Sequence, residues 1–370
     1  MEKLNFRHKA RQDWGKDNVI PMRSFAREPI ELILGKEICD LEKRLAAWVQ
    51  TERCVAVSDA ASGIALALMA AGIGSGDSVM CAALGCTLPV QGIMTAGALP
   101  IFADINPNTY TIDPFCLEYA LGKLKRNNQA IPRALIATDL FGAPCHLTEL
   151  EQICRSQGIV LIEDMSGAFG AKYLGKMAGG FGRFSVASFA TSGPWDELGG
   201  GAVFCRTEED AAKISALRRA ASQQHIEPEN RIPYMGSTDA ILTNMRLDSL
   251  KEEHANRRKI AIRYRENLEK KVRMQQLVDG GQSVYSQLVV ALPKAGSRPA
   301  VIKRLFQMNI PSEPPLCGLQ NADNDWNRTM LVNTKVLAER LLSLPIHSHL
   351  SGQVVDFICE SLLEAIAVDS

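Results

Sequence analysis

Short apolar runs alternate with helical stretches over the first half of this chain, and this alternation limits the folds that it can adopt. The apolar runs lie at residues 54–57, 78–81, 99–103, 134–138 and 160–163, and the helical stretches between them lie at 62–71, 89–96, 114–125 and 148–157. Near-continuous apolar strands joined by helices are typical of a mainly parallel sheet with helices on both faces. The pattern therefore predicts an α/β fold.

The second half of the chain predicts a smaller unit after the sheet. Patterns in the rest of the chain favour helices at 35–52, 208–220, 247–271, 298–307 and 352–365, strands at 202–205 and 284–292, and a loop at 223–238. A chain of 370 residues exceeds what one hydrophobic core usually holds, roughly 250 to 300 residues. We therefore expect a large domain at residues 1–250, including an N-terminal arm, and a small C-terminal domain at 251–370.

Composition argues against several classes of partner. Lys and Arg total 41 and Asp and Glu total 41, so no global basic field is available to attract nucleic acid. No apolar run approaches the ~20 residues of a membrane span, and the N-terminus lacks the apolar core of a signal peptide. We expect a cytoplasmic protein that binds neither nucleic acid nor membrane.

Metal binding is not expected either. The ten cysteines are scattered, and the spacing of Cys81 and Cys86 does not match a Cys-x-x-Cys site, so most are expected to be buried thiols. His347 and His349 have no Cys, Asp or Glu cluster nearby.

Two places in the sequence fall where such sheets bind ligands, beyond the carboxyl ends of strands. Asp164 follows one apolar run, and the turn from Ser58 to Ser62 follows another. Ser62 is expected to open a helix, whose free amides favour an anion, or to serve simply as its N-cap. Asp164 is either a binding carboxylate or the cap of a strand-end turn.

Several motifs carry a family resemblance. The segment Ser188–Gly201, together with Leu161–Asp164, resembles the cofactor loop of the nucleotide-sugar aminotransferases of the DegT/DnrJ/StrS type. These enzymes belong to fold type I of the pyridoxal phosphate (PLP) enzymes, the aspartate aminotransferase superfamily. Further matches are Gly72–Asp77, Asp104–Asp113, Asp139–Gly142 and Ala338–His347, so that the resemblance extends over roughly residues 21 to 363. It implies a large three-layer α/β/α domain with a mainly parallel sheet, plus a smaller C-terminal α+β domain.

The resemblance also implies a set of site residues. Asp164 matches the carboxylate that pairs with the pyridine nitrogen of PLP, and Ser62 and Ser188 match hydroxyls that meet the cofactor phosphate. Asn244 and Arg246 match a segment that reaches the cofactor phosphate and the substrate of the neighbouring subunit. The implied partners are a nucleotide sugar and a second copy of the chain in a homodimer.

The sequence departs from the family pattern in four features, which involve five positions. The lysine that forms the Schiff base with PLP is expected five residues after Ser188, where this chain has Gly193. Ala60 and Ala61 replace Gly and Thr of the phosphate turn. Cys86 replaces the aromatic residue that stacks on the pyridine ring, and Gly167 replaces a Gln or His. Without a lysine, neither covalent attachment nor the usual proton transfer is available.

Three hypotheses about function follow. The chain is a diverged sugar aminotransferase that uses PLP or pyridoxamine phosphate (PMP) noncovalently at most. Alternatively, it is a catalytically inactive homologue that binds a nucleotide sugar or partners an active paralogue. The third hypothesis is a PLP-independent enzyme on the same fold.

Overall fold

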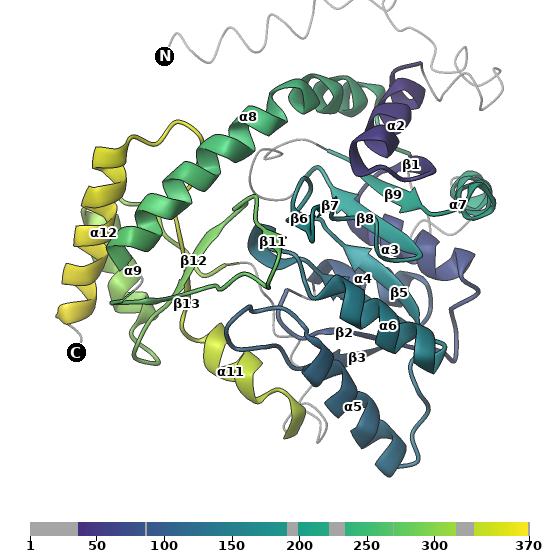
Figure 1. Ribbon diagram of the computed structural model, residues 1–370, viewed down its shortest axis with the longest axis horizontal. Coiled ribbons are helices and arrows are strands. Elements are labelled where there is room, and N and C mark those ends of the chain that lie inside the picture. Colours follow the sequence, from purple (N-terminus) through teal and green to yellow (C-terminus); the bar gives the residue numbers. More distant parts are fainter. Residues whose placement is uncertain are drawn as a thin grey trace, which may run out of the picture. The chain divides into compact units, whose positions relative to one another are not determined.

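A seven-stranded sheet forms the centre of the large domain (Figure 1). The computed structural model describes residues 36–85, 87–190, 199–221, 234–268, 270–315 and 329–368. Within them the strand order is β1-β9-β8-β5-β4-β2-β3. The strands are β1 (Arg53–Val57), β2 (Ser78–Ala82), β3 (Leu99–Ala103), β4 (Ala134–Thr138), β5 (Val160–Asp164), β8 (Phe184–Ser188) and β9 (Gly201–Cys205).

One strand of this sheet runs against the others. Strand β9 pairs in antiparallel fashion with both β1 and β8, whereas β8, β5, β4, β2 and β3 pair in parallel. The carboxyl ends of the remaining six strands therefore lie at one edge of the sheet, together with the start of β9.

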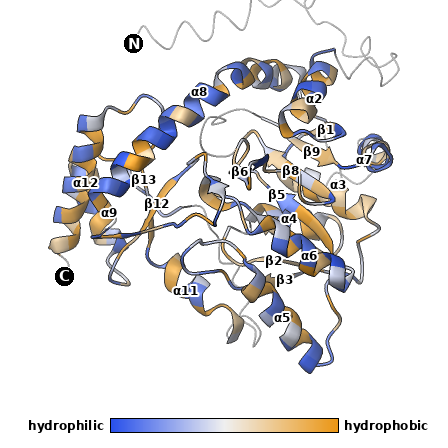
Figure 2. Ribbon diagram, viewed as in Figure 1, coloured by the Kyte–Doolittle hydropathy of each residue, from blue (hydrophilic) through white to orange (hydrophobic). Residues whose placement is uncertain are grey.

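Two groups of helices pack on the sheet. Helices α3 (Ala60–Ala70), α4 (Thr87–Thr95) and α7 (Glu208–Ala221) form one group, in which α3 contacts both of the others. Helices α5 (Pro114–Arg126) and α6 (Leu147–Gln157) form the second group and contact β3, β4 and β5. Figure 2 shows hydrophobic residues along the central strands and hydrophilic residues on the outer helices. This distribution matches a sheet that is covered on both faces.

The C-terminal part has its own sheet and core. Helix α8 (Ser237–Leu268) leads into strands β10 (Arg273–Met274), β12 (Leu288–Ala291) and β13 (Leu341–Leu344), which pair in antiparallel order β10-β12-β13. Helices α9 (Arg298–Gln307) and α12 (Gly352–Ala367) pack together, and α12 also packs on α8. Alternation along β12 places Val289 in the core of the large domain and Val290 in the C-terminal core.

Small elements complete the described chain. Strands β6 (Lys172–Tyr173), β7 (Lys176–Met177) and β11 (Gly281–Gln282) form a three-stranded antiparallel sheet. Helix α2 (Lys36–Val49) precedes β1, the short helix η4 (Leu140–Gly142) follows β4, and α11 (Val332–Ala338) precedes β13.

The expected fold class is confirmed, and three local expectations are wrong. Helix α8 begins at Ser237 rather than near residue 247, so the expected loop ends earlier. Residues 284–287 are not part of the expected strand, because β12 begins at Leu288. Helix α3 begins at Ala60, with Asp59 as its N-cap, so Ser62 neither opens nor caps it. The expected domain boundary at residue 250 falls inside α8 and stays a prediction.

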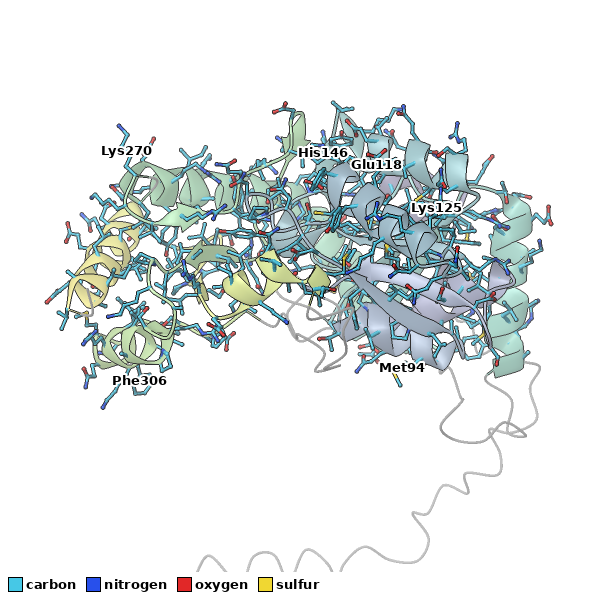
Figure 3. The ribbon with its side chains drawn as sticks, turned by 90° about the horizontal axis from the view of Figure 1, so that it is seen from below. Met94, Glu118, Lys125, His146, Lys270 and Phe306 are labelled. Atoms are coloured by element: carbon cyan, nitrogen blue, oxygen red, sulfur yellow. The ribbon has the colours of Figure 1, made fainter. Side chains whose placement is uncertain are left out.

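The burial of the described cysteines agrees with the expectation of buried thiols. Of the eight cysteines described, six are buried, Cys116 is half-buried and Cys39 is exposed. The described residues contain no cluster of His, Cys, Asp and Glu able to hold a metal ion. Among the described helices, none combines the length and apolar character that a membrane crossing requires. Figure 3 shows the exposed side chains of Met94 on α4 and Phe306 on α9 pointing outward.

Candidate active site

The candidate site lies at the edge of the sheet where the parallel strands end. Register places Asp164 of β5 beside Thr138 of β4 and opposite Val186 of β8. Ser188, the last residue of β8, pairs with Gly201 at the start of β9, and Gly201 in turn pairs with Val57 at the end of β1. The pairing brings residues from five strands to one edge.

Asp164 is a buried carboxylate with a defined orientation. Its side chain is fully buried, Oδ1 accepts hydrogen bonds from the Ser166 amide (3.1 Å) and hydroxyl (2.5 Å), and Oδ2 accepts one from the Thr138 hydroxyl (3.2 Å). Burial raises the pKa of Asp164, and the hydrogen bonds from Ser166 and Thr138 act in the opposite direction. The two expected roles of Asp164, a binding carboxylate and the cap of a strand-end turn, are thus compatible. Oδ1 caps the turn through Ser166, whereas Oδ2 accepts from Thr138 and takes no part in the cap.

Two further carboxyl groups are buried next to this edge. Asp139 and Glu163 have no exposed surface. The Cys145 amide donates to Asp139 Oδ1 (2.8 Å), while the Gly179 amide donates to Glu163 Oε1 (2.6 Å). Burial, followed by the negative charge of Glu163, raises the pKa of Asp139 well above its ordinary value. Because two adjacent buried carboxyl groups disfavour double ionisation, we expect this pair to keep a shared proton above the pH at which an ordinary aspartate ionises.

The N-terminus of α3 is closed by a side chain of the protein itself. Asp59 has extended backbone angles (φ −166°, ψ 169°), and its Oδ1 accepts from the amide of Ser62 (2.8 Å). Its Oδ2 accepts from the hydroxyls of Ser58 (2.7 Å) and Ser62 (2.8 Å). Asp59 and Ser58 are half-buried, so this cluster borders the open edge. The Asp59 carboxylate thus accepts hydrogen bonds from both the hydroxyl and the backbone N–H of Ser62. This hydroxyl was the one expected to meet a phosphate.

Gly201, the last glycine of the run that leads into β9, packs directly against the backbone of Asp59. A Cβ atom at Gly201 would lie 2.7 Å from the Ala187 carbonyl oxygen and 3.0 Å from the Asp59 carbonyl carbon. Only glycine permits this approach of β9 to the start of α3. The Ser188 hydroxyl accepts the amide of Ala190 (3.2 Å) at the same edge.

Gly167 leaves space beside an unpartnered hydroxyl. A Cβ atom at Gly167 would meet Ser286 Oγ at 3.6 Å and the Asp139 carbonyl oxygen at 3.7 Å, which are ordinary van der Waals distances. Ser286 is 6% exposed, and its hydroxyl has no hydrogen-bond partner in the described part of the chain. The loop before β12 therefore reaches the candidate site, which the sequence did not indicate.

Asn244 and Arg246 lie on α8 and make contacts within this chain. Arg44 of α2 donates to the Asn244 carbonyl (2.9 Å) and side-chain oxygen (3.1 Å). Arg246 is exposed and lies 3.4 Å from Glu253. Their predicted role toward a neighbouring subunit stays a prediction.

Two expected positions lie outside the described residues, namely Gly193 and Cys86. Ala60 and Ala61, which were expected in the turn before α3, are the first two residues of this helix and carry no hydroxyl. Asp59 is the residue of this site that sequence reasoning missed. Its signal was present, since an aspartate three residues before a serine at the start of an apolar helix is typical of an N-cap.

Comparison with known proteins identifies the class. The model of the DegT/DnrJ/EryC1/StrS aminotransferase family matches residues 26–363, and the chain belongs to this family.

Individual relatives agree over most of their length. The chain is 28% identical over 337 residues to UDP-2-acetamido-2-deoxy-3-oxo-D-glucuronate aminotransferase of Pseudomonas aeruginosa, covering 90% of this chain and 91% of the relative. It is 31% identical over 291 residues to the putative pyridoxal phosphate-dependent aminotransferase EpsN of Bacillus subtilis, covering 76% and 74%. A crystal structure of a DegT DnrJ EryC1 StrS aminotransferase from Brucella abortus superposes with a TM-score of 0.80 at 26% identity, covering 89% and 90%.

The described residues fit one end of PLP and not the other. Asp164 suits the ring nitrogen, because it is buried and, among the described residues, its Oδ2 accepts a hydrogen bond from Thr138 alone. The phosphate end does not fit, because the amide of Ser62 and the hydroxyls of Ser58 and Ser62 already donate to Asp59. Among the described residues, no arginine or lysine pairs with Asp59 to offset its charge.

Proposed function

We propose that this chain is a diverged sugar aminotransferase that binds a nucleotide sugar and forms no Schiff base between PLP and a lysine of its own. PLP or PMP is then bound noncovalently at most. The observation that carries the proposal is the sequence that connects β8 to β9. Between Ser188 and Gly201, which pair with each other, no lysine occurs, and Gly193 lies five residues after Ser188, where the family resemblance implies a lysine.

The pairing of β8 with β9 supports the choice of this segment. Five residue pairs, from Phe184 with Cys205 to Ser188 with Gly201, align the two strands without a bulge. The lysines that flank this segment are Lys172 and Lys176, on the exposed hairpin of β6 and β7, and Lys213, on α7. None of the three lies on a strand of the large sheet.

The proposal is tested by reductive trapping. Purified protein is mixed with PLP, reduced with borohydride, digested and analysed by mass spectrometry, while a parallel sample is scanned for visible absorbance. We expect no stoichiometric pyridoxyl adduct on any lysine and no absorbance band of a bound imine. A single lysine that is labelled stoichiometrically would contradict the proposal.

Asp164 provides the matched test of noncovalent binding. Because a buried anion stabilises a protonated ring nitrogen, Asp164→Asn is expected to weaken PMP binding at least tenfold, about 1.4 kcal/mol. The exposed Asp279 provides the control, since Asp279→Asn is expected to leave PMP affinity unchanged. Equal PMP affinity of the wild type and Asp164→Asn would show that PMP does not bind at this edge.

The substrate class rests on the relatives. The Pseudomonas aeruginosa relative is named for a UDP-linked sugar, and other relatives are named for dTDP-linked sugars. We therefore expect a UDP-, dTDP- or GDP-sugar to raise the melting temperature of the protein, and the matching free nucleotide to raise it less. A screen that finds no stabilising nucleotide sugar would favour the third hypothesis, a PLP-independent enzyme on the same fold.

A further inference from the structure

The N-terminus of α3 in this chain differs from an open anion site in one respect, which is the position of the Asp59 carboxylate. A helix start offers free backbone amides and a partial positive charge, and both favour a phosphate. Here the carboxylate takes the amide of Ser62 at 2.8 Å and two hydroxyl donors at 2.7 and 2.8 Å. Three donors that would hold a phosphate oxygen are therefore engaged.

We propose that Asp59 acts as a built-in substitute for the cofactor phosphate and makes this cleft select against phosphate-bearing ligands at the start of α3. The inference deepens the proposed function and rests on it. A dianion that approaches Ala60 and Ala61 meets the negative charge of Asp59 and competes with it for the same donors. Ligands that carry a ring without a phosphate do not meet this penalty.

The neighbouring backbone keeps Asp59 in place. Gly201 lies against the Asp59 backbone, with 3.0 Å between the carbonyl carbon of Asp59 and the Cβ position of Gly201. The extended backbone of Asp59 itself aims the side chain at the first turn of α3. Because the three donors already have an acceptor in Asp59, a phosphate that displaces this side chain gains no additional hydrogen bonds from them.

The chain offers a matched control elsewhere. Asp113 caps α5 in the same manner, with extended backbone angles and a hydrogen bond of 2.9 Å from the amide of Cys116 to its Oδ1. Asparagine is as good an N-cap as aspartate, so Asp59→Asn and Asp113→Asn are both expected to fold. Only the first removes a negative charge from the candidate site.

The test compares two ligands that differ only in the phosphate. PMP and pyridoxamine form no imine with lysine side chains, so their binding to the full-length protein reports noncovalent affinity alone. Calorimetric titrations measure the ratio of the pyridoxamine dissociation constant to the PMP dissociation constant in the wild type and in both variants. We expect a ratio within threefold of one in the wild type and in Asp113→Asn, and a ratio at least tenfold higher in Asp59→Asn.

Two results would overturn the inference. One is a wild-type ratio already above ten that Asp59→Asn leaves unchanged. The other is an Asp59→Asn variant, folded by circular dichroism, that gains no PMP affinity. Failure of the proposed function is detected separately, as a labelled lysine in the borohydride experiment. That labelling does not alter the ratio of the pyridoxamine and PMP dissociation constants.

Discussion

At the residue scale, the buried carboxyl pair Asp139 and Glu163 makes stability depend on pH in a defined direction. The pKa of Asp139 is raised in the folded state by burial and by Glu163, whereas in the unfolded chain it returns to about 4. The folded state therefore keeps a proton that the unfolded state releases. Stability contributed by this proton is present below pH 4 and declines as the pH rises toward the folded pKa.

Asp139→Asn is expected to remove this dependence. The amide still accepts from the Cys145 backbone and donates to Glu163 in place of the shared proton. Relative to the wild type, the free energy of unfolding of the variant should increase between pH 5 and pH 8, by at most about 1.4 kcal/mol per pH unit. Urea unfolding at both pH values measures it, with the exposed Asp279→Asn as control. A difference that is constant with pH would contradict the shared proton.

The sequence located Asp164 but not the acceptor role of Asp59. Asp164 follows a buried apolar run, so the strand itself places it at the carboxyl edge. The N-cap of α3 depends on where the helix starts, and apolar spacing does not fix that position to within one turn. The sequence pattern predicts that α3 starts at Ser62, whereas the helix begins two residues earlier, at Ala60.

At the element scale, the close contact between α3 and α4 depends on Gly92. A Cβ atom at this position would lie 2.6 Å from Ile64 Cβ and 2.8 Å from the Ala61 carbonyl oxygen, closer than real Cβ contacts. Gly92→Ala is therefore expected to push α4 away from α3, with a loss of about 1 to 3 kcal/mol in the free energy of unfolding.

Gly122 of α5 is the matched control for this substitution. Its Cβ position meets only the flexible Arg126 side chain, at 3.4 Å. Gly122→Ala is expected to stabilise the protein by up to about 1 kcal/mol, because alanine has the higher helix propensity. Urea denaturation of both variants measures the two effects. Equal changes in both variants would indicate that helix propensity rather than packing determines them.

The bounds of a helix or strand were predictable where a single pattern of apolar residues continued to the end of that element. Strands β3 and β4 match their expected ranges residue for residue, since each is a mainly apolar run that ends before an aspartate, Asp104 or Asp139. Helix α8 was predicted too short, because its first turns carry the apolar residues Ile241, Leu242 and Met245 on an exposed face. A pattern search that looks for apolar residues facing a core does not detect such a helix.

At the scale of the whole molecule, this exposed face of α8 supports the predicted homodimer. Ile241 and Leu242 are 45% and 42% exposed and Met245 is 66% exposed, next to Asn244 and Arg246. Large apolar side chains that gather on one exposed face often mark a protein interface. A second copy of the chain is the occupant that the family resemblance implies.

We expect the wild type to be a dimer by light scattering and Leu242→Asp with Met245→Asp to be a monomer at micromolar concentration. Burying two carboxylates in an apolar interface is unfavourable by several kcal/mol. Phe306→Asp on α9 is the control, because Phe306 is 76% exposed and lies outside this face. A wild type that is monomeric, or a double variant that remains dimeric, would refute the assignment of this interface.

The carboxylate at the start of α3 also affects how the protein responds to cofactor supply in the cell. A protein whose helix start is completed by a bound phosphate gains stability as RT ln(1 + [L]/Kd), about 2.7 kcal/mol at one hundred times Kd, and loses it when the ligand is scarce. In this chain the anion at the helix start is the Asp59 side chain, which is covalently attached to the protein. We therefore expect its folding equilibrium to depend less on the supply of PLP than that of a protein with a bound phosphate at this position.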